Sequence, residues 1–170
     1  MNLPELKIGK LVAQVPIIQG GMAIRLSTAP LAAAVANEGG IGLIAASGMG
    51  LDELRKEIRM ARELTGGKGI IGINAMVAAR QFLDLITTAA EEGIDLIVAG
   101  AGFSRDIFAV GKKYGVEVVP IVSSARLAQT AEKLGASAVV VEGTEAGGHL
   151  GTQQSIKEIL PEVIEAVNIP

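Results

Sequence analysis

The chain has 170 residues, of which 49% are hydrophobic and 19% charged, and its formal net charge is −3. This composition suits one globular domain with a sizeable core and argues against a disordered chain or a basic nucleic-acid-binding surface. Cysteine is absent, which excludes disulfides and thiolate chemistry. Polar residues interrupt every apolar run before the ~20 residues of a membrane helix, and the N-terminus lacks a signal peptide's apolar core. We therefore expect a cytoplasmic protein with no membrane partner.

Short apolar runs recur along the chain, and most of them are almost wholly apolar. Strands covered on both faces of a sheet have this composition, so the runs predict buried parallel strands. The runs are Pro16–Ile18, Ile41–Ala45, Ile70–Ile73, Leu96–Ala99, Val116–Val119 and Ala138–Val141. Glycines stand before five of them, where helix C-caps belong: Gly39, Gly67, Gly93, Gly115 and Gly135.

The segments between the runs predict amphipathic helices, because apolar residues recur there at three- and four-residue spacing. One such set is Leu54, Ile58, Ala61 and Leu64. The predicted N-caps are Thr28, Asp52, Ser104 and Ser124. Pro161 fits the first turn of a last helix that runs to about Val167.

Alternation of six strands with six helices predicts an α/β fold with a parallel sheet, either doubly wound or a (β/α)₈ barrel. No linker divides the chain, so residues 1–170 are expected to form a single domain. A complete barrel needs eight strands and ~250 residues. The barrel interpretation therefore predicts a domain truncated to about six β-α units.

In either architecture, ligands bind at the carboxyl ends of the strands. Small and polar residues follow the runs there: Gln19–Met22, Asn74–Met76, Gly100–Gly102, Ser123–Ser124 and Glu142–His149. Such a rim suits a flat, hydrogen-bonding cofactor. Met22 and Met76 fit a cofactor wall and core packing equally well.

The segment Glu142–Gly151 holds two carboxylates, four glycines and the only histidine of the chain. Gly147 and Gly148 let the backbone approach a ligand closely, and His149 can exchange a proton near neutral pH. The alternative is a solvated loop with a surface histidine.

Other signals are weaker. Gly40–Ala45 fits the letters of a dinucleotide-binding fingerprint. Its glycines stand at the start of a predicted strand, however, whereas those of the fingerprint follow the end of one. Gly100–Arg105 lacks the third glycine of that fingerprint. Asp95, Glu142 and Glu145 show no spacing that requires a metal, so none is expected.

Several segments together resemble the nitronate monooxygenase (2-nitropropane dioxygenase) family, which includes flavin-dependent enoyl-[acyl-carrier-protein] reductases. The similarity runs from about Leu11 to Pro170 and is most specific at the Glu-Ala-Gly-Gly-His segment. The segments that carry it are Pro16–Met22, Leu31–Asn37 with Gly39-Gly40, Gly72–Asn74, Gly100–Gly102 and Glu142–Gly151.

The resemblance implies the N-terminal part of a (β/α)₈ barrel that binds FMN at its carboxyl face. It implies Gly21, Met22 and Asn74 along the flavin and His149 as the active-site base. The full set of implied cofactor-binding residues is Gln19, Gly20, Gly21, Met22, Asn74, Gly100, Gly102, Glu142, Gly147 and Gly148.

Two departures from the family pattern stand out. The last two strands, whose glycine-rich turns hold the FMN phosphate, are missing from these residues. Some nitronate monooxygenases also carry a lysine after the fifth strand, where this chain has Ser123-Ser124.

The resemblance thus implies an FMN-dependent oxidation of alkyl nitronates by O₂. The alternative is an enoyl-thioester reductase that uses NAD(P)H as reductant, and the non-enzymatic alternative is an inactive barrel fragment without flavin. A small-molecule partner is expected, and a homodimer is left open.

Overall fold

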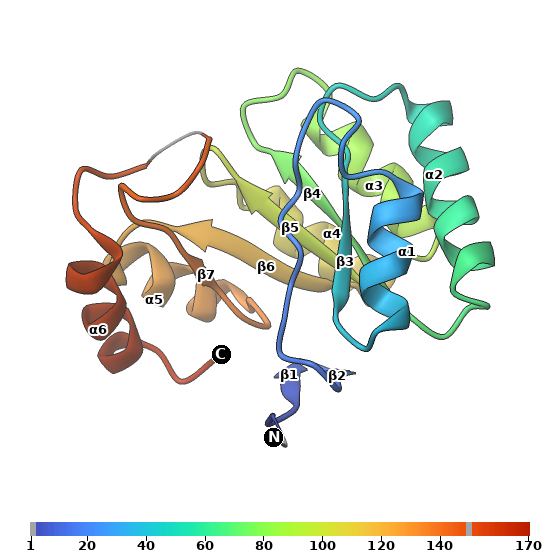
Figure 1. Ribbon diagram of the computed structural model, residues 1–170. Coiled ribbons are helices and arrows are strands. Elements are labelled where there is room, and N and C mark those ends of the chain that lie inside the picture. Colours follow the sequence, from blue (N-terminus) through green and yellow to red (C-terminus); the bar gives the residue numbers. More distant parts are fainter. Residues whose placement is uncertain (1–2, 149–150) are drawn as a thin grey trace.

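A curled sheet of five parallel strands forms the centre of the computed structural model, which describes residues 3–148 and 151–170 (Figure 1). The strands lie side by side in chain order, each in parallel register with the next. They are β3 (Ile41–Ala45), β4 (Ile70–Met76), β5 (Leu96–Gly100), β6 (Glu117–Val122) and β7 (Val140–Val141). This sequential order is that of a (β/α) barrel and excludes the doubly wound alternative, in which the strand order reverses.

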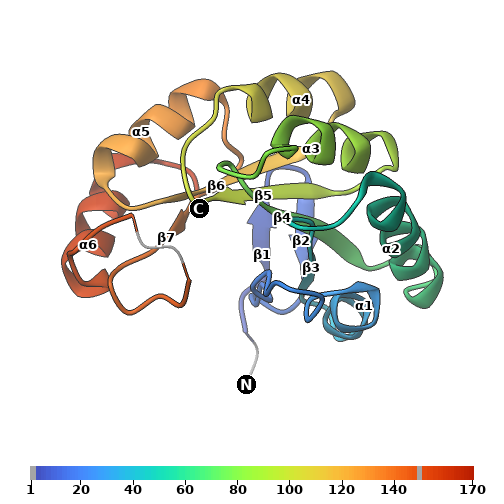
Figure 2. The same ribbon diagram turned by 90° about the horizontal axis from the view of Figure 1, so that it is seen from above.

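Helices cover only the convex face of this sheet, in an arc that Figure 2 shows from above. They are α1 (Ala29–Asn37), α2 (Leu51–Leu64), α3 (Phe82–Glu91), α4 (Asp106–Tyr114), α5 (Ala125–Leu134) and α6 (Ile156–Ala166). Alternate strand residues serve the two faces: in β5, Ile97 packs among the helices while Leu96 and Val98 belong to the inner core.

The first and last predicted strands are shorter than expected. Pro16–Ile18 contributes a single parallel bridge, Ile18 to Ile41. The Ile17 carbonyl accepts from the Ile41 N–H (2.9 Å) and the Gln19 N–H donates to the Ile41 carbonyl (3.0 Å), which holds the segment beside β3. Ala138–Val141 is reduced to Val140–Val141. On the far side of β7, the Val139 N–H donates to the Pro170 carbonyl (2.9 Å), so the segment after α6 runs beside this strand.

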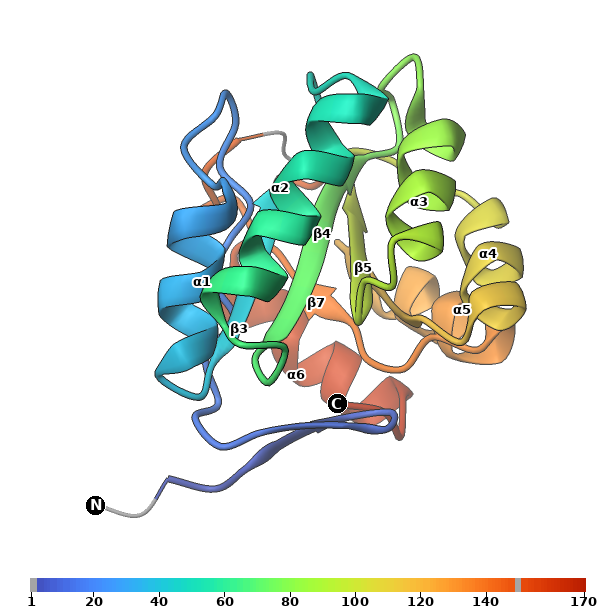
Figure 3. The same cartoon turned by 90° about the vertical axis from the view of Figure 1, so that its right-hand side faces the viewer.

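An antiparallel hairpin of β1 (Leu6–Ile8) and β2 (Leu11–Ala13) lies below one end of the sheet, as Figure 3 shows. Sequence reasoning missed it because its strands have three residues each, which is too short to show a period, and Lys7 interrupts the first of them. Ile8 and Ala13 are buried against inner-face residues such as Ile41 and Val119. The hairpin therefore covers part of the inner face of the sheet.

Glycine residues have two structural roles in this fold: they follow or cap the ends of helices, and one of them, Gly42, permits a close backbone contact. Two of the five predicted C-cap glycines, Gly115 and Gly135, are left-handed C-caps. The other three follow the C-cap residues Glu38, Thr65 and Glu92, and they too have positive φ. Gly42, inside β3, packs directly under α1: a Cβ there would lie 1.9 Å from the Ala32 carbonyl oxygen. Gly42 is therefore needed for the packing of α1 on β3. This agrees with the sequence analysis, which did not assign Gly40–Ala45 to a dinucleotide-binding fingerprint.

The predicted N-caps are correct in part. Ser124 accepts a hydrogen bond from the Leu127 N–H (3.3 Å), and Thr28 occupies the cap position without a side-chain bond. Two predictions are wrong, because Gly50 rather than Asp52 precedes α2, and Arg105 rather than Ser104 precedes α4. Pro161 lies inside α6 rather than in its first turn, because the helix starts at Ile156, where Glu145 and Glu158 satisfy N-terminal N–H groups.

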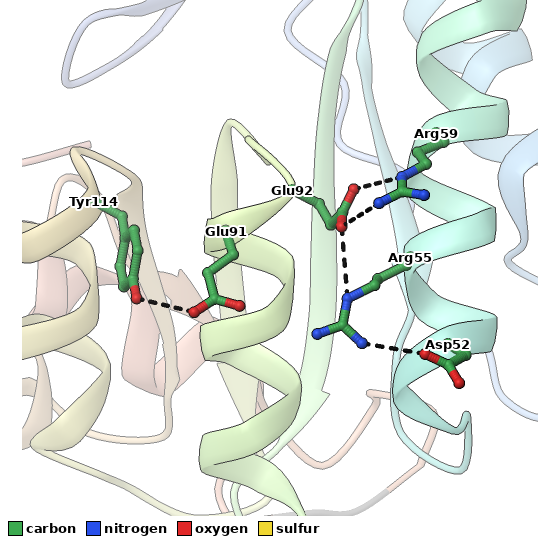
Figure 4. Close-up of polar contacts among 6 residues, drawn as sticks. All are labelled: Asp52, Arg55, Arg59, Glu91, Glu92 and Tyr114. Carbon is green, nitrogen blue, oxygen red and sulfur yellow. Dashed lines mark hydrogen bonds and ion pairs between the residues drawn. The ribbon is translucent and has the colours of Figure 1, made fainter.

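Charged side chains tie the outer helices together (Figure 4). Glu92, at the end of α3, accepts two hydrogen bonds from Arg59 of α2 (2.7 and 2.8 Å) and pairs with Arg55 at 3.5 Å. The Tyr114 hydroxyl of α4 donates to Glu91 (3.3 Å). These contacts bridge three successive β-α units.

None of the helices in the described part of the chain is long and apolar enough to cross a membrane.

Candidate functional site

A cavity of about 770 Å³ opens at the carboxyl ends of the strands. Its walls come from the segment after Ile18, from all five strands of the sheet or the turns after them, and from the loop after β7. The lining residues are Ile18, Gly20, Gly21, Met22, Ala23, Leu26, Leu43, Ala45, Ser47, Asn74, Met76, Val98, Gly100, Ala101, Ile121, Val140, Glu142, Gly147 and Gly148.

A buried hydroxyl holds the Gly20–Met22 turn at the cavity wall. The Ser27 side chain accepts hydrogen bonds from the Met22 N–H and the Gln19 amide, both at 2.8 Å, and donates to the Gly20 carbonyl at 3.1 Å. The Gln19 amide oxygen in turn accepts from the Leu43 N–H (3.1 Å). Because Ser27 is fully buried, this network fixes the turn relative to β3.

Asn74 projects from β4 beside the same turn. In the sheet it pairs with Ala45 on one side and Val98 on the other. A Cβ on Gly21 would lie 2.2 Å from the Asn74 Cβ, so only glycine lets the turn approach so closely. Within residues 3–148 and 151–170, the Asn74 amide makes no hydrogen bond. Asn74 lines the cavity, so as far as the described residues go its amide is available to a ligand.

The loop after β7 closes one side of the cavity. Glu142, Gly147 and Gly148 line it, and a Cβ on either glycine would meet nothing within 4 Å. Glu145 turns away from the lining, since its carboxylate accepts from the Ile156 N–H at 3.0 Å. Hydrogen bonding to that N–H lowers the pKa of the Glu145 carboxyl.

Eight of the ten predicted cofactor-binding residues line this one cavity, as the lining residues above show. The other two stand outside the lining: Gln19 braces the first turn, and Gly102 lies behind the rim, where a Cβ would meet Val77 at 3.2 Å. His149, the predicted catalytic residue, lies outside the described residues.

Sequence reasoning missed the apolar floor of the cavity, made by Leu43, Val98, Ile121 and Val140. Their inward orientation follows from the two-residue period of each strand once the register is known. It also missed Ser47, whose hydroxyl accepts from the Met76 N–H (2.8 Å).

The lining combines this apolar floor with a few polar groups on Asn74, Ser47 and Glu142, and its described part contains no lysine or arginine. Such a surface suits a flat molecule with apolar faces and hydrogen-bonding groups along its edge.

A sheet wound in chain order, helices on its outer face and a cavity at its carboxyl edge define the class of (β/α)-barrel proteins that bind ligands at that edge. The sequence pattern of the nitronate monooxygenase family matches residues 5–170, nearly the whole chain. The chain therefore belongs to the nitronate monooxygenase family.

Individual proteins agree with this assignment. FabK from Thermotoga maritima is 37% identical, with a TM-score of 0.87 over 93% of this chain and 50% of that protein. A nitroalkane oxidase from Streptomyces ansochromogenes is 26% identical, with a TM-score of 0.81 over 93% of this chain and 57% of that protein. A (3aS,4S,5R,7aS)-5-hydroxy-7a-methyl-1-oxo-octahydro-1H-indene-4-carboxyl-CoA dehydrogenase of Mycobacterium tuberculosis is 32% identical over 89% of this chain and 42% of its own length. The chain thus spans about half the length of the proteins it matches.

Proposed function

We propose that this chain forms part of an FMN-dependent oxidoreductase that oxidises alkyl nitronates with O₂. The observation that supports the proposal most directly is the cavity itself. The glycine turn Gly20–Met22, the Asn74 amide and the glycine loop Gly147-Gly148 converge on it from three separate parts of the chain.

The described residues fit the isoalloxazine ring of a flavin. The cavity volume of about 770 Å³ lies in the range of cofactor sites. Leu43, Val98 and Ile121 supply an apolar surface for a ring face, and the Asn74 amide supplies both a donor and an acceptor for a ring edge. Gly147 and Gly148 leave open space where other residues would place a side chain. When bound, FMN supplies the electron acceptor that none of the amino-acid side chains provides.

His149 is the proposed base of the reaction. It follows Gly148, which lines the cavity, and an imidazole nitrogen can take the acidic C–H proton of a nitroalkane near neutral pH. A preformed nitronate has already lost that proton. His149→Asn should therefore lower turnover of the neutral nitroalkane by ~10²–10⁴-fold and affect the nitronate far less. Steady-state oxygen consumption with both substrates measures the difference, and equal losses would contradict the assignment.

A second candidate is reduction of an enoyl thioester with NAD(P)H as the reductant. The M. tuberculosis relative, whose name specifies a carboxyl-CoA substrate, favours a thioester. Ser123-Ser124, in place of the lysine that some nitronate monooxygenases carry, favours it as well.

One set of measurements on the flavin-loaded protein separates the two. Oxygen consumption with propionate-3-nitronate supports nitronate oxidation, whereas NAD(P)H oxidation dependent on crotonyl-CoA supports thioester reduction. A protein that takes up no FMN even from an excess of added flavin, judged by the flavin absorbance bands near ~375 and ~450 nm, would contradict both and leave the non-catalytic alternative.

A further inference from the structure

We infer that Glu145 is a positioning residue, which anchors the cavity-lining loop 143–148 to the N-terminus of α6 rather than touching the ligand. The inference concerns the acidic residue of the Glu-Ala-Gly-Gly-His segment. Its consequence for flavin binding rests on the proposed function.

The contacts of Glu145 run from the loop to the helix. Its carboxylate accepts a hydrogen bond from the Ile156 N–H (3.0 Å), the first residue of α6, and one from the Thr144 hydroxyl (3.5 Å). The Thr144 N–H donates to the Gln154 carbonyl (2.9 Å), which joins the same two segments again. These hydrogen bonds hold Thr144 and Glu145 beside Gln154 and Ile156.

Gly143 shows how tightly the loop and helix approach. A Cβ at this position would lie 2.3 Å from the Ile156 nitrogen and 2.6 Å from a Glu145 carboxylate oxygen. Only glycine leaves room for the carboxylate to reach the helix. The negative charge also lies where the partial positive charge of a helix N-terminus is greatest.

The two acidic residues of the segment therefore have different tasks. Glu142 lines the cavity, whereas Glu145 does not, although Gly147 and Gly148, two and three residues later, do. If the anchor is lost, those glycines lose a fixed position relative to the sheet and the cavity loses a defined wall.

Glu158 provides a matched control. Its carboxylate accepts from the Ser155 N–H (2.9 Å) at the same helix end, but it makes no described contact with residues 143–148. Removing either carboxylate deprives α6 of one N-terminal hydrogen bond. Only removal of Glu145 also breaks a hydrogen bond between the loop and the helix.

The test compares Glu145→Ala, Glu145→Gln and Glu158→Ala by amide hydrogen exchange without added cofactor, followed by FMN titration. We expect Glu145→Ala to speed exchange of the hydrogen-bonded Thr144 and Ala146 amides by about 5- to 30-fold, the scale of a lost helix cap. Its FMN dissociation constant should rise by a similar factor. Glu145→Gln keeps an acceptor oxygen and should restore most of both, and Glu158→Ala should speed exchange near Ser155 only.

Equal exchange at Thr144 and Ala146 in Glu145→Ala and the parent protein would overturn the inference. So would equal effects of Glu145→Ala and Glu158→Ala on that loop. If the exchange pattern is as expected but no variant, nor the parent, binds FMN, the proposed function fails while the anchor stands. Circular dichroism identifies a variant that has unfolded; if Glu145→Ala does so, Glu145→Asp takes its place, since its carboxylate is one methylene too short to reach the Ile156 N–H and exchange at Thr144 and Ala146 should still rise.

Discussion

At the scale of single residues, Ser27 shapes the cavity through three hydrogen bonds to the Gln19–Met22 segment. Its hydroxyl, fully buried, satisfies the Met22 N–H, the Gln19 amide and the Gly20 carbonyl at once. A buried polar group left without a partner costs more free energy than the hydrogen bond itself contributes. The turn that lines the cavity therefore depends on a residue that does not line it.

Ser27→Ala should lower the free energy of unfolding by about 1–3 kcal/mol, because it removes three part-buried hydrogen bonds that hold the Gly20–Met22 turn. Urea denaturation measures the change. Thr130→Ala is the control, since its exposed hydroxyl bonds only within α5, to the Arg126 carbonyl (2.8 Å), and its loss should stay within about 0.5 kcal/mol of the parent. A Ser27→Ala variant as stable as the control would contradict the role given to the network.

At the scale of elements, β3 and α1 pack with backbone against backbone. A Cβ atom added at Gly42 would lie 1.9 Å from the Ala32 carbonyl oxygen. Helix α1 would therefore have to move if residue 42 carried a side chain. Gly42→Ala should destabilise the fold by roughly 2–3 kcal/mol or more, as overpacking of a rigid contact does. Gly50→Ala is the matched change, because a Cβ there meets nothing within 4 Å and φ is −74°. Thermal melting of both variants should separate them clearly; similar losses would disprove the close contact.

The ion-pair cluster between α2 and α3 predicts a dependence of stability on pH. Hydrogen bonds from Arg59 lower the pKa of Glu92, with Arg55 adding a weaker attraction. A carboxyl whose pKa is lower in the folded state stabilises the protein above its unfolded pKa of about 4.3, and that contribution is lost as the pH falls through the lower folded pKa.

Glu92→Gln should therefore cost roughly 0.5–1 kcal/mol at pH 7 and almost nothing at a pH below the folded pKa. Urea denaturation at both pH values measures it, and added salt should shrink the difference at pH 7. Glu38→Gln, at an exposed position without an ion pair among the described residues, is the control. A Glu92→Gln effect that is independent of pH would mean that packing, not charge, links the two helices.

At the scale of the whole molecule, the described chain offers a site for a ring but none for a phosphate. The cavity lining in the described residues contains a carboxylate, Glu142, and no cationic side chain. Exposed apolar side chains such as Ile17 beside β3 (56%) and Ile164 on α6 (65%) mark the two flanks of the curled sheet. The chain spans about half the length of its relatives, and the family resemblance implies that the glycine-rich turns for the FMN phosphate follow strands that are not among these residues.

The 170-residue polypeptide should consequently bind riboflavin and FMN with nearly equal affinity. A single charge-assisted hydrogen bond to a phosphate contributes ~1.5–3 kcal/mol, or about 10-fold or more in affinity. Fluorescence titration of the same preparation with both flavins measures the ratio. A preference for FMN above about 10-fold would show that the described residues, or His149 and Leu150, already hold the phosphate.

The sequence alone determined the order of strands and helices and eight of the nineteen residues that line the cavity. Its residue pattern left a doubly wound sheet and a barrel open; the family resemblance implied the barrel, and the strand order of the structure decided it. Buried parallel strands need unbroken apolar runs, and left-handed helix ends need glycine, so both are visible in a single sequence. The polar and glycine residues at the strand ends, such as Asn74 and Gly147, were identifiable because parallel strands bring their carboxyl ends to one edge.

Only the tertiary structure decided which groups face the cavity and which support it. Gln19 and Glu145 carry the same kinds of polar atoms as Asn74 and Glu142, yet their atoms bond Ser27 and Ile156 instead. The hairpin of β1 and β2 was likewise invisible, because three-residue strands have no periodicity to detect and gain their stability from the core they cover. A side chain's direction follows from contacts with residues far away in the chain, and such contacts leave no local pattern in a sequence.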